Sequence, residues 1–526
     1  MKTRIVARFL VALGLGWSFG AAGCGDGGAG GSTDGAAGFA DASTDAPADG
    51  DGGSTGDAGV PDAGPALPAA LCGMPPYRLA PESDVGRLVR YEEIDLLNMD
   101  AESVDALLSQ FGLATLSPVP YGSRVFRYRY TTQDRGIFVE ATAMLGLPAN
   151  AALPAGDLPL VAYEHGTSGF SDPCAPSRTL MGQGQIAILA SLGFVVVAPD
   201  YVGMTGFGDA STAPHAYVVG EQAAIGSWDA VRAGEKLLSK LKTGLSVLRG
   251  VIPWGGSQGG HAALFMTLYQ PYYATEYEVP ALVAAVPPTD LLPLAKRAVS
   301  AYSPPTISFA AILTSMKKWY GAPPDVSGVF TDDAPYRFAS TLEAQIFRTD
   351  KCDPSEAYKE IDDNPGEQRP DLVYQPGFID AVLGGAWDAI EPWGCYLTEN
   401  SLATTSVRPL RFPPTFMIYG EKDEFIVTGA MRDDFDRLCG LGHNLDYLEC
   451  TEADHTEGVV WSLKEQVDWV RDRLAGGDLP PDRCTRRAAV CCSGTPAERC
   501  AGTDGGSPGD AAVTDAGPAD GAIGGD

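Results

Sequence analysis

A serine between two glycines is the first feature of the sequence that could do chemistry. Gly255, Ser257 and Gly259 form the pattern G-x-S-x-G, after an apolar run at residues 247–254 and before a helical pattern at residues 261–269. At a sharp turn from strand to helix, a serine hydroxyl stands clear of the sheet, and glycines on either side let neighbouring backbone pass close. The helix N-terminus favours negative charge developing there. The pattern predicts that Ser257 is a nucleophile.

A serine hydroxyl is a poor nucleophile unless a base removes its proton, and the chain has only five histidines. His455 lies in a loop after the apolar run at residues 445–448 and before the helical pattern at residues 459–474. In chain order it follows the serine and the acids considered next, which is the order Ser, acid, His. We expect His455 to be the base.

The other four histidines suit other roles. His165 comes too early in the chain, at the end of a predicted strand. His261 follows Ser257 on the same predicted helix, where we expect it to pack beneath the turn. His215 follows a glycine-rich loop and is predicted to be a surface or loop residue, and His443 precedes the last predicted strand.

A third residue must hold the imidazole in one tautomer and stabilise its charged form. The predicted strand at residues 415–419 runs into Gly420-Glu421-Lys422-Asp423-Glu424. Asp423 lies at the first turn beyond that strand and is the residue we favour. Glu424 is one alternative, and Asp290, which follows the apolar run at residues 281–286, is another.

The oxyanion of a tetrahedral intermediate needs preorganised N–H donors. The predicted strand at residues 158–163 is followed by Glu164-His165-Gly166-Thr167, a His-Gly loop that precedes the serine turn in the chain. We assign the donors to the backbone N–H groups of Thr167 and Gln258.

Alternating strand and helix patterns must position these residues. Two antiparallel strands are predicted at residues 125–130 and 137–145, around a turn at 133–136. Short buried strands then alternate with helices, which favours an α/β fold with a doubly wound sheet. The strands are predicted at 158–163, 194–198, 247–254, 281–286, 415–419 and 445–448, and the helices at 181–192, 218–241, 261–269, 428–438 and 459–474. The rhythm stops at about residues 288–409, where an inserted cap is predicted.

These segments resemble the α/β-hydrolase superfamily and, within it, the secretory lipases of the fungal lipase A type. The resemblance implies a mostly parallel sheet flanked by helices, a mainly helical cap, and hydrolysis of carboxylic esters, often acylglycerols, with no metal or organic cofactor. The acyl-enzyme would form on Ser257, with His455 as base oriented by Asp423. The resemblance to this family rests on residues 164–167, 198–203, 227–233, the serine turn, 419–424 and 454–455. Asp200 in this set is expected to be structural.

Two alternative functions remain open at this stage. A serine peptidase or acylaminoacyl hydrolase could use the same scaffold, because fold and triad do not fix the bond that is cleaved. A non-catalytic surface binding protein is the other. The N-terminus and the Cys-rich end are not features of the resembled family.

The N-terminus predicts export. Residues 1–23 combine a basic start with a short apolar stretch, typical of a signal peptide. Ala21-Ala22-Gly23-Cys24 resembles a bacterial lipobox, so Cys24 is the expected lipidation site, with an ordinary signal peptide as the alternative. We expect a disordered Gly/Ala/Asp linker at 24–66, the hydrolase domain at 67–480, a Cys-rich segment at 481–500 and a disordered acidic tail at 501–526. The expected location is the bacterial cell envelope, at the outer membrane or cell surface, with secretion as the alternative.

Composition and net charge restrict the classes of partner that the protein could bind. The chain has 37 basic and 67 acidic residues, a formal charge of −30, so nucleic acid and anionic lipid surfaces are excluded as primary partners. The expected partner is a small-molecule or lipid ester substrate, with membrane contact only through the N-terminal anchor. Ten cysteines besides Cys24 favour disulfides, whose pairing the sequence leaves open. For Cys484, Cys491, Cys492 and Cys500 we expect disulfides rather than a metal site.

Overall fold

The computed structural model describes residues 72–500, except 111, 150–155, 210–212, 322–324, 334–336, 348–351 and 353–367. The predicted signal peptide, the lipidation site Cys24, the linker at 24–66 and the tail at 501–526 therefore lie outside the described residues. Among the helices that are described, none combines the length and the apolarity needed to cross a membrane.

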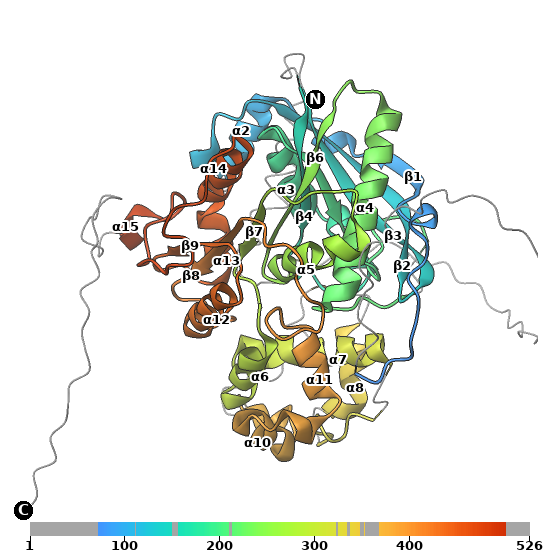
Figure 1. The fold of residues 1–526 in the computed structure, drawn as a ribbon, viewed down its shortest axis with the longest axis vertical. Coiled ribbons are helices and arrows are strands. Elements are labelled where there is room, and N and C mark those ends of the chain that lie inside the picture. Colours follow the sequence, from blue (N-terminus) through green and yellow to red (C-terminus); the bar gives the residue numbers. More distant parts are fainter. Residues whose placement is uncertain are drawn as a thin grey trace, which may run out of the picture.

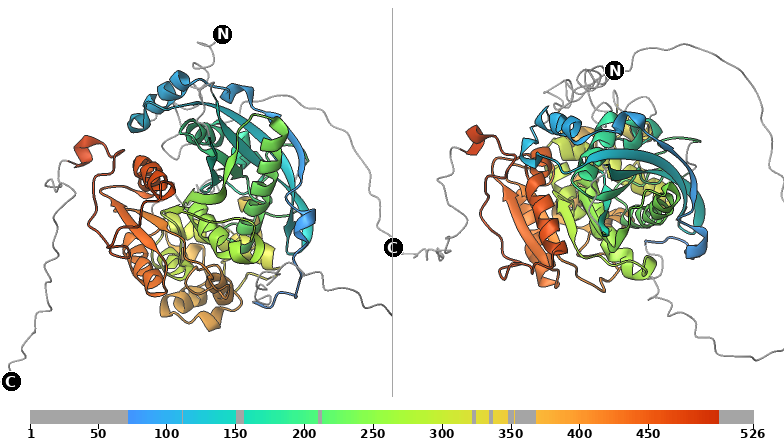
Figure 2. Two further views of the ribbon diagram at one scale, coloured as in Figure 1. Left: turned by 45° about the horizontal axis from the view of Figure 1, so that its top comes forward. Right: turned by 90° about the horizontal axis from the view of Figure 1, so that it is seen from above.

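One twisted sheet runs through the described part of the chain, with nine strands in the order β1-β2-β3-β5-β4-β6-β7-β8-β9. The pairs from β1 to β5 are antiparallel, and those from β5 through β4 to β9 are parallel. Figure 2 shows the twist from β1–β3 at one edge to β8 and β9 at the other. The strands are β1 (Leu88–Glu93), β2 (Gly122–Asp134), β3 (Ile137–Ala149), β4 (Leu158–Glu164), β5 (Val195–Pro199), β6 (Val247–Gly256), β7 (Leu282–Ala285), β8 (Thr415–Gly420) and β9 (Leu445–Cys450).

Helices cover both faces of this sheet, as a doubly wound fold requires. One buried apolar cluster joins the sheet to α4 (Gly220–Leu241), α5 (Gln258–Tyr273) and α12 (Thr428–Gly440). A second cluster joins the opposite face to α2 (Ala101–Gln110), α3 (Leu180–Ser191) and α14 (Leu463–Leu474). In β5, Val197 belongs to the first cluster and Val196 to the second, because successive side chains in a strand point to opposite faces. The predicted fold class is confirmed.

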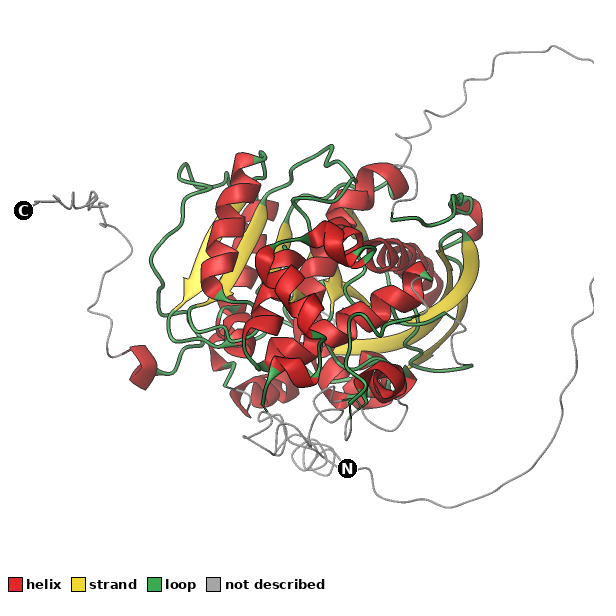
Figure 3. Ribbon diagram, turned by 90° about the horizontal axis from the view of Figure 1, so that it is seen from below, coloured by secondary structure: helices red, strands yellow, loops and turns green. Residues whose placement is uncertain are grey.

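A layer of helices lies below the sheet in Figure 1, between β7 and β8 in the chain. It has its own buried apolar cluster, and the view from below in Figure 3 shows these helices in front of the strands. None of the nine strands falls in this part of the described chain. The helices are α6 (Leu291–Ser300), α7 (Pro304–Tyr320), α8 (Phe338–Ile346), α10 (Pro376–Gly384) and α11 (Trp393–Glu399).

The structure also corrects some predicted elements. The first hairpin is longer than predicted: β2 and β3 pair down to Asp134 and Ile137, around Arg135 and Gly136. Both turn residues have positive φ, 51° and 77°, which suits a tight hairpin turn. The helix predicted at 459–474 is two helices, α13 (His455–Trp461) and α14. The strand β1 was missed because its sequence LVRYEE has no continuous apolar run.

Five disulfides cross-link the described chain, and they use all ten cysteines expected to pair. The pairs are Cys72–Cys395, Cys174–Cys352, Cys439–Cys484, Cys450–Cys492 and Cys491–Cys500. The expected disulfide-stapled C-terminal segment is confirmed, so its thiols are not metal ligands. Disulfides persist in oxidising compartments, and they indicate an exported protein.

Candidate active site

Ser257 occupies the sharp turn between β6 and α5. Its φ of 56° and ψ of −122° are unusual for a residue with a side chain, and such backbone strain clusters at functional sites. The backbone N–H of Ser257 donates to Ala285 O at 2.8 Å, which ties the turn to β7. A Cβ added at Gly259 would lie only 1.9 Å from Glu164 O, so the second glycine of the pattern is a steric requirement. The turn therefore positions the hydroxyl at the end of the sheet.

His455 is the first residue of α13 and reaches both neighbours in the predicted order. Its Nε2 lies 2.8 Å from Ser257 Oγ, and its Nδ1 lies 2.8 Å from Asp423 Oδ2. Because a carboxylate can only accept, Nδ1 carries the proton and Nε2 is free to accept the serine proton. Asp454 begins the helix with a capping box to Glu457, which fixes the backbone on which the imidazole is mounted.

Asp423 uses its two carboxylate oxygens differently. Oδ1 accepts from the backbone N–H groups of Phe425 at 2.9 Å and Ile426 at 2.8 Å, which leaves Oδ2 for the imidazole. The loop after β8 thus holds the carboxylate from its own backbone. Asp423 is 7% exposed, so the imidazole interaction is shielded from solvent.

The two alternative acids lie elsewhere. Glu424 Oε2 accepts from the backbone N–H of His455 at 3.2 Å and is not hydrogen-bonded to the ring. Asp290 caps α6 through the Leu292 N–H at 2.9 Å, and its other oxygen pairs with Arg437 at 2.7 Å. The structure therefore brings Asp423, and neither alternative, to the Nδ1 side of the imidazole.

The electrostatics of His455 suit a base that becomes charged during a reaction. Burial alone would lower its pKa, but the charge of Asp423 and their hydrogen bond outweigh burial and raise the pKa above the ordinary 6.5. The pair therefore stabilises an imidazolium, which is the state a general base reaches after it takes a proton from Ser257.

The His-Gly loop after β4 adjoins the serine. A Cβ added at Gly166 would lie 3.9 Å from Ser257 Cβ, so this loop and the serine turn are neighbours. Tyr201 donates its hydroxyl to His165 O at 3.0 Å and fixes the loop from one side. Thr167 is exposed, and its hydroxyl lies 2.7 Å from the hydroxyl of Tyr217. Thr167 thus follows the glycine that adjoins Ser257, and Gln258 follows Ser257 itself at the start of α5.

The remaining histidines are not placed to act on Ser257. His261 packs beneath the turn, as expected, and donates from Nε2 to Asn400 O at 2.9 Å. Burial lowers the pKa of His165 to about 4 and that of His215 to about 3. His215 lies in a loop, which is one of the two expected placements, but it is buried and not at the surface. This residue is 2% exposed, and its Nε2 lies 3.2 Å from the side-chain nitrogen of Gln258.

Two buried acids beside the site are structural, and only one of them was recognised from the sequence. Asp200 accepts from Ser177 N–H at 2.8 Å and from the hydroxyls of Ser177 and Thr142, both at 2.6 Å, as suits its expected structural role. Glu164, at the start of the His-Gly loop, accepts from Ser227 Oγ at 2.8 Å. Burial raises the pKa of Glu164 to about 8, so its carboxyl is mostly protonated at neutral pH.

Comparison with a protein-family model covers the centre of the site. Residues 174–303 match the family described as secretory lipase. This range includes the serine turn but neither Asp423 nor His455. A search of curated protein sequences finds no match.

Solved structures with this fold include esterases and lipases. The rice cell wall degrading esterase LipA from Xanthomonas oryzae aligns with a TM-score of 0.61 at 20% identity, over 75% of this chain and 99% of the esterase. Lipase A from Candida antarctica in its closed state aligns with a TM-score of 0.56 at 15% identity, over 80% of this chain and 90% of the lipase. These likenesses establish a lipase-like α/β-hydrolase fold.

Proposed function

We propose that this protein hydrolyses carboxylic esters through an acyl-enzyme on Ser257. One observation carries the proposal: a hydrogen-bonded chain runs from Ser257 Oγ through both ring nitrogens of His455 to Asp423, with 2.8 Å at each step. Its support is the strained serine turn, the nearby loop at Gly166 and the match to the secretory lipases. In this role Ser257 is the nucleophile, His455 the general base and Asp423 the residue that orients it.

The reaction would proceed in two balanced halves. Ser257 Oγ attacks the ester carbonyl carbon while its proton passes to His455 Nε2, and the resulting oxyanion accepts from the backbone N–H groups of Thr167 and Gln258. When the C–O bond to the alcohol breaks, His455 returns the proton to the departing alkoxide. Water then attacks the acyl carbon, gives a proton to His455, and displaces Ser257 Oγ, which takes that proton back. The acid product leaves.

The decisive experiment replaces the nucleophile. Ser257→Ala in the full chain should abolish turnover of a p-nitrophenyl ester, whereas Ser109→Ala, at an exposed position on α2, should leave kcat unchanged. A fluorophosphonate probe should label the parent protein and not the Ser257→Ala variant. Ester hydrolysis retained by Ser257→Ala at the parental rate would rule the proposal out. Faster turnover of a matched anilide than of the ester would favour a peptidase instead.

We propose a class of substrates, defined by the length of the acyl chain, and not one particular ester. The match to secretory lipases and the fold shared with lipase A favour esters whose acyl chain is longer than that of acetate. The chain would bind under the helices between β7 and β8. A series of p-nitrophenyl esters from acetate to palmitate, measured at constant detergent, should show a maximum of kcat/KM at a chain longer than acetate. A steady decline from acetate onwards would contradict a lipase and favour a short-chain esterase.

We also propose that Cys24 carries the lipid anchor of this exported enzyme. The support is the lipobox-like Ala21-Ala22-Gly23-Cys24 and the Asp-rich, Gly-rich sequence that separates it from Cys72. The full-length chain expressed in a bacterium should incorporate labelled fatty acid and partition into detergent, and Cys24→Ala should do neither. Labelling that survives Cys24→Ala would contradict the proposed site.

A further inference from the structure

Both residues assigned as oxyanion donors are contacted by side chains of one short segment. The hydroxyl of Tyr217 lies 2.7 Å from Thr167 Oγ1, and His215 Nε2 lies 3.2 Å from Gln258 Nε2. Thr167 belongs to the loop after β4, whereas Gln258 begins α5, so the two donors come from elements far apart in the sequence. The segment at residues 215–217 therefore bridges the two sides of the proposed oxyanion hole.

The contact of the other ring nitrogen, Nδ1, defines the tautomer of His215. Nδ1 lies 3.4 Å from Val202 O, and because a carbonyl only accepts, Nδ1 carries the proton. Nε2 is then an acceptor, and the amide of Gln258 donates to it. The imidazole is buried and remains neutral at assay pH, since its pKa is about 3. His215 consequently acts as a fixed acceptor rather than as an acid or a base.

The segment is itself held in place. The Ala216 N–H donates to Gln222 Oε1 at 2.9 Å, on the first turn of α4. Phe170 packs edge-on against Tyr217, with ring centroids 4.9 Å apart and an interplanar angle of 80°. Tyr201 stacks on His215 at 5.8 Å and 14°. Tyr217 is 6% exposed, so its hydroxyl is presented to Thr167 from a packed environment.

Such a segment matters because donor placement is critical in this reaction. Preorganised N–H groups stabilise the oxyanion only if they do not have to move, and a displacement of about 1 Å can cost about 100-fold in rate. Gln258 stands at the very start of its helix, and its side chain is held by His215. Thr167 lies in an irregular, exposed part of its loop, so its side-chain hydrogen bond to Tyr217 is the contact that fixes it there.

We propose that residues 215–217 set the spacing of the oxyanion hole, with Tyr217 and His215 as positioning residues for Thr167 and Gln258. This inference rests on the proposed function, because it needs Thr167 and Gln258 to supply the donors. Neither Tyr217 nor His215 is a catalytic residue in this scheme, since each acts through another side chain. The effect should therefore appear in the rate of the chemical step and not in ground-state binding.

The test is Tyr217→Phe, which removes the hydroxyl and keeps the ring that packs against Phe170. We expect kcat on a p-nitrophenyl ester to fall about 10-fold with KM unchanged, because a loosened donor weakens transition-state stabilisation. The matched control is Tyr130→Phe, which also removes a buried hydroxyl, here one that donates to Gly226 O at 2.9 Å. The control should lower Tm without changing kcat.

A double-mutant cycle separates positioning from a general loss of stability. Thr167→Val removes the partner hydroxyl and keeps the backbone N–H. If Tyr217 acts through Thr167, the double variant should lose no more kcat than the more impaired single variant. Losses that multiply would mean independent effects and would contradict the positioning role. The parallel variant His215→Phe keeps the stacking ring and should lower kcat by a similar factor.

The outcomes distinguish this inference from the proposed function. If Ser257→Ala is inactive while Tyr217→Phe and His215→Phe both retain the parental kcat, the role of residues 215–217 is overturned and the hydrolase stands. If Ser257→Ala retains activity, the proposed function fails and the inference falls with it. Circular dichroism and Tm measured on every variant identify one that fails to fold, and in that case the cycle is completed with Thr167→Val and Thr167→Ser. Parental kcat in Thr167→Val would then overturn the inference.

Discussion

Asp423 accepts a hydrogen bond from His455 through one carboxylate oxygen and binds its own loop through the other. Oδ2 lies 2.8 Å from the imidazole, and Oδ1 accepts from the backbone N–H groups of Phe425 and Ile426. The carboxylate therefore cannot rotate away from the imidazole without losing two backbone hydrogen bonds. This arrangement holds the imidazole in one tautomer and orientation.

The role of Asp423 predicts a large loss on Asp423→Asn. The amide is nearly the same shape but cannot stabilise an imidazolium, so kcat on a p-nitrophenyl ester should fall by about 10³- to 10⁴-fold. Glu424→Gln is the matched control, because Glu424 accepts from the backbone N–H of His455 and not from the imidazole ring, and kcat should stay within about threefold of the parent. An equal loss in the two variants would contradict the choice of Asp423.

The pH dependence of kcat/KM should follow His455. Asp423 raises the pKa of this imidazole above 6.5, and the base must be neutral to take the serine proton. Activity is therefore lost as pH falls through a pKa above 6.5 and is full on the alkaline side. In Asp423→Asn the attraction is removed, so burial dominates and the inflection in the residual activity should move to lower pH. An inflection that shifts upward would contradict this account.

Glu164 should make folding stability fall with increasing pH. Burial raises its folded pKa to about 8 from an ordinary 4.5, so the folded chain binds a proton more tightly than the unfolded chain. The stabilisation is complete below pH 4.5 and is lost progressively as pH rises to about 8. Glu164→Gln keeps an acceptor for Ser227 and removes the titration, so Tm should rise at pH 8 and change little near pH 4.

The comparison for Glu164 is Glu102→Gln, at an exposed position on α2. This control should leave the pH dependence of Tm as it is in the parent. Identical pH profiles for Glu164→Gln and the parent would contradict a raised pKa of this carboxyl in the folded chain.

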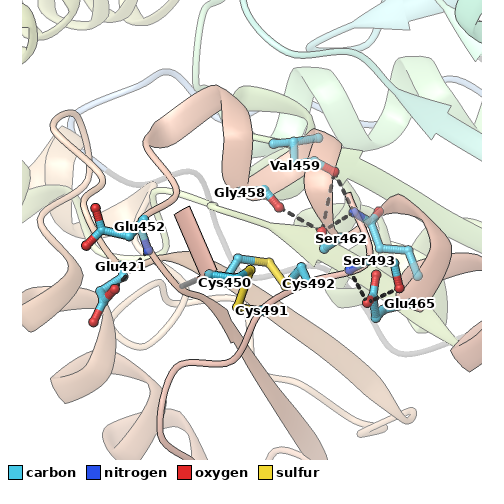
Figure 4. The surroundings of a disulfide bond; sticks show 12 residues. Glu421, Cys450, Glu452, Gly458, Val459, Ser462, Glu465, Cys491, Cys492 and Ser493 are labelled. Atoms are coloured by element: carbon cyan, nitrogen blue, oxygen red, sulfur yellow. Dashed lines mark hydrogen bonds between the residues drawn. A yellow bond between two sulfur atoms is a disulfide. The ribbon is translucent and has the colours of Figure 1, made fainter. Parts of the chain in front are cut away.

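The Cys-rich segment braces the helix that begins at His455. Cys492 joins Cys450 at the end of β9, and Figure 4 shows Ser493 beside Glu465, to whose Oε1 its N–H donates at 2.7 Å. Arg499 also pairs with Glu457, in the first turn of α13, at 3.0 Å. These contacts reach both α13 and α14. The segment therefore stabilises the histidine loop from the outside.

Removal of the Cys450–Cys492 bond should destabilise the protein. The double variant Cys450→Ala/Cys492→Ala should lose about 2–4 kcal/mol of unfolding free energy, because the unfolded chain gains freedom. Cys491→Ala/Cys500→Ala is the comparison: its cysteines are separated by 9 residues rather than 42, so its loss should be smaller. Chemical denaturation under non-reducing conditions measures both. A larger loss in the second variant would contradict a loop-length effect.

Local patterns predicted the parts of the site that lie at the ends of strands. The serine turn, the acid loop and the histidine loop each follow an apolar run, and parallel strands bring their carboxyl ends to one edge of the sheet. The sequence alone could not choose finally among Asp423, Glu424 and Asp290, because that choice depends on which carboxylate faces Nδ1.

Contacts between loops that are far apart in the sequence leave no local pattern from which they could be predicted. The glycine-rich stretch before His215 predicts a surface or loop residue. The structure places His215 in a loop, but buried against Gln258. Its importance depends on tertiary packing over a separation of 43 residues, which no spacing rule links. The pairing of the ten cysteines was open for the same reason, since it depends on which loops meet in space.

The bond between Cys72 and Cys395 has a mechanical consequence. Cys72 is the first described residue, and its partner lies in α11, on the helical layer rather than on the sheet. A pull applied along the N-terminal side of the chain would pass through this covalent link into α11 before it reached any strand. The helical layer would thus share a load that the backbone alone would deliver to β1.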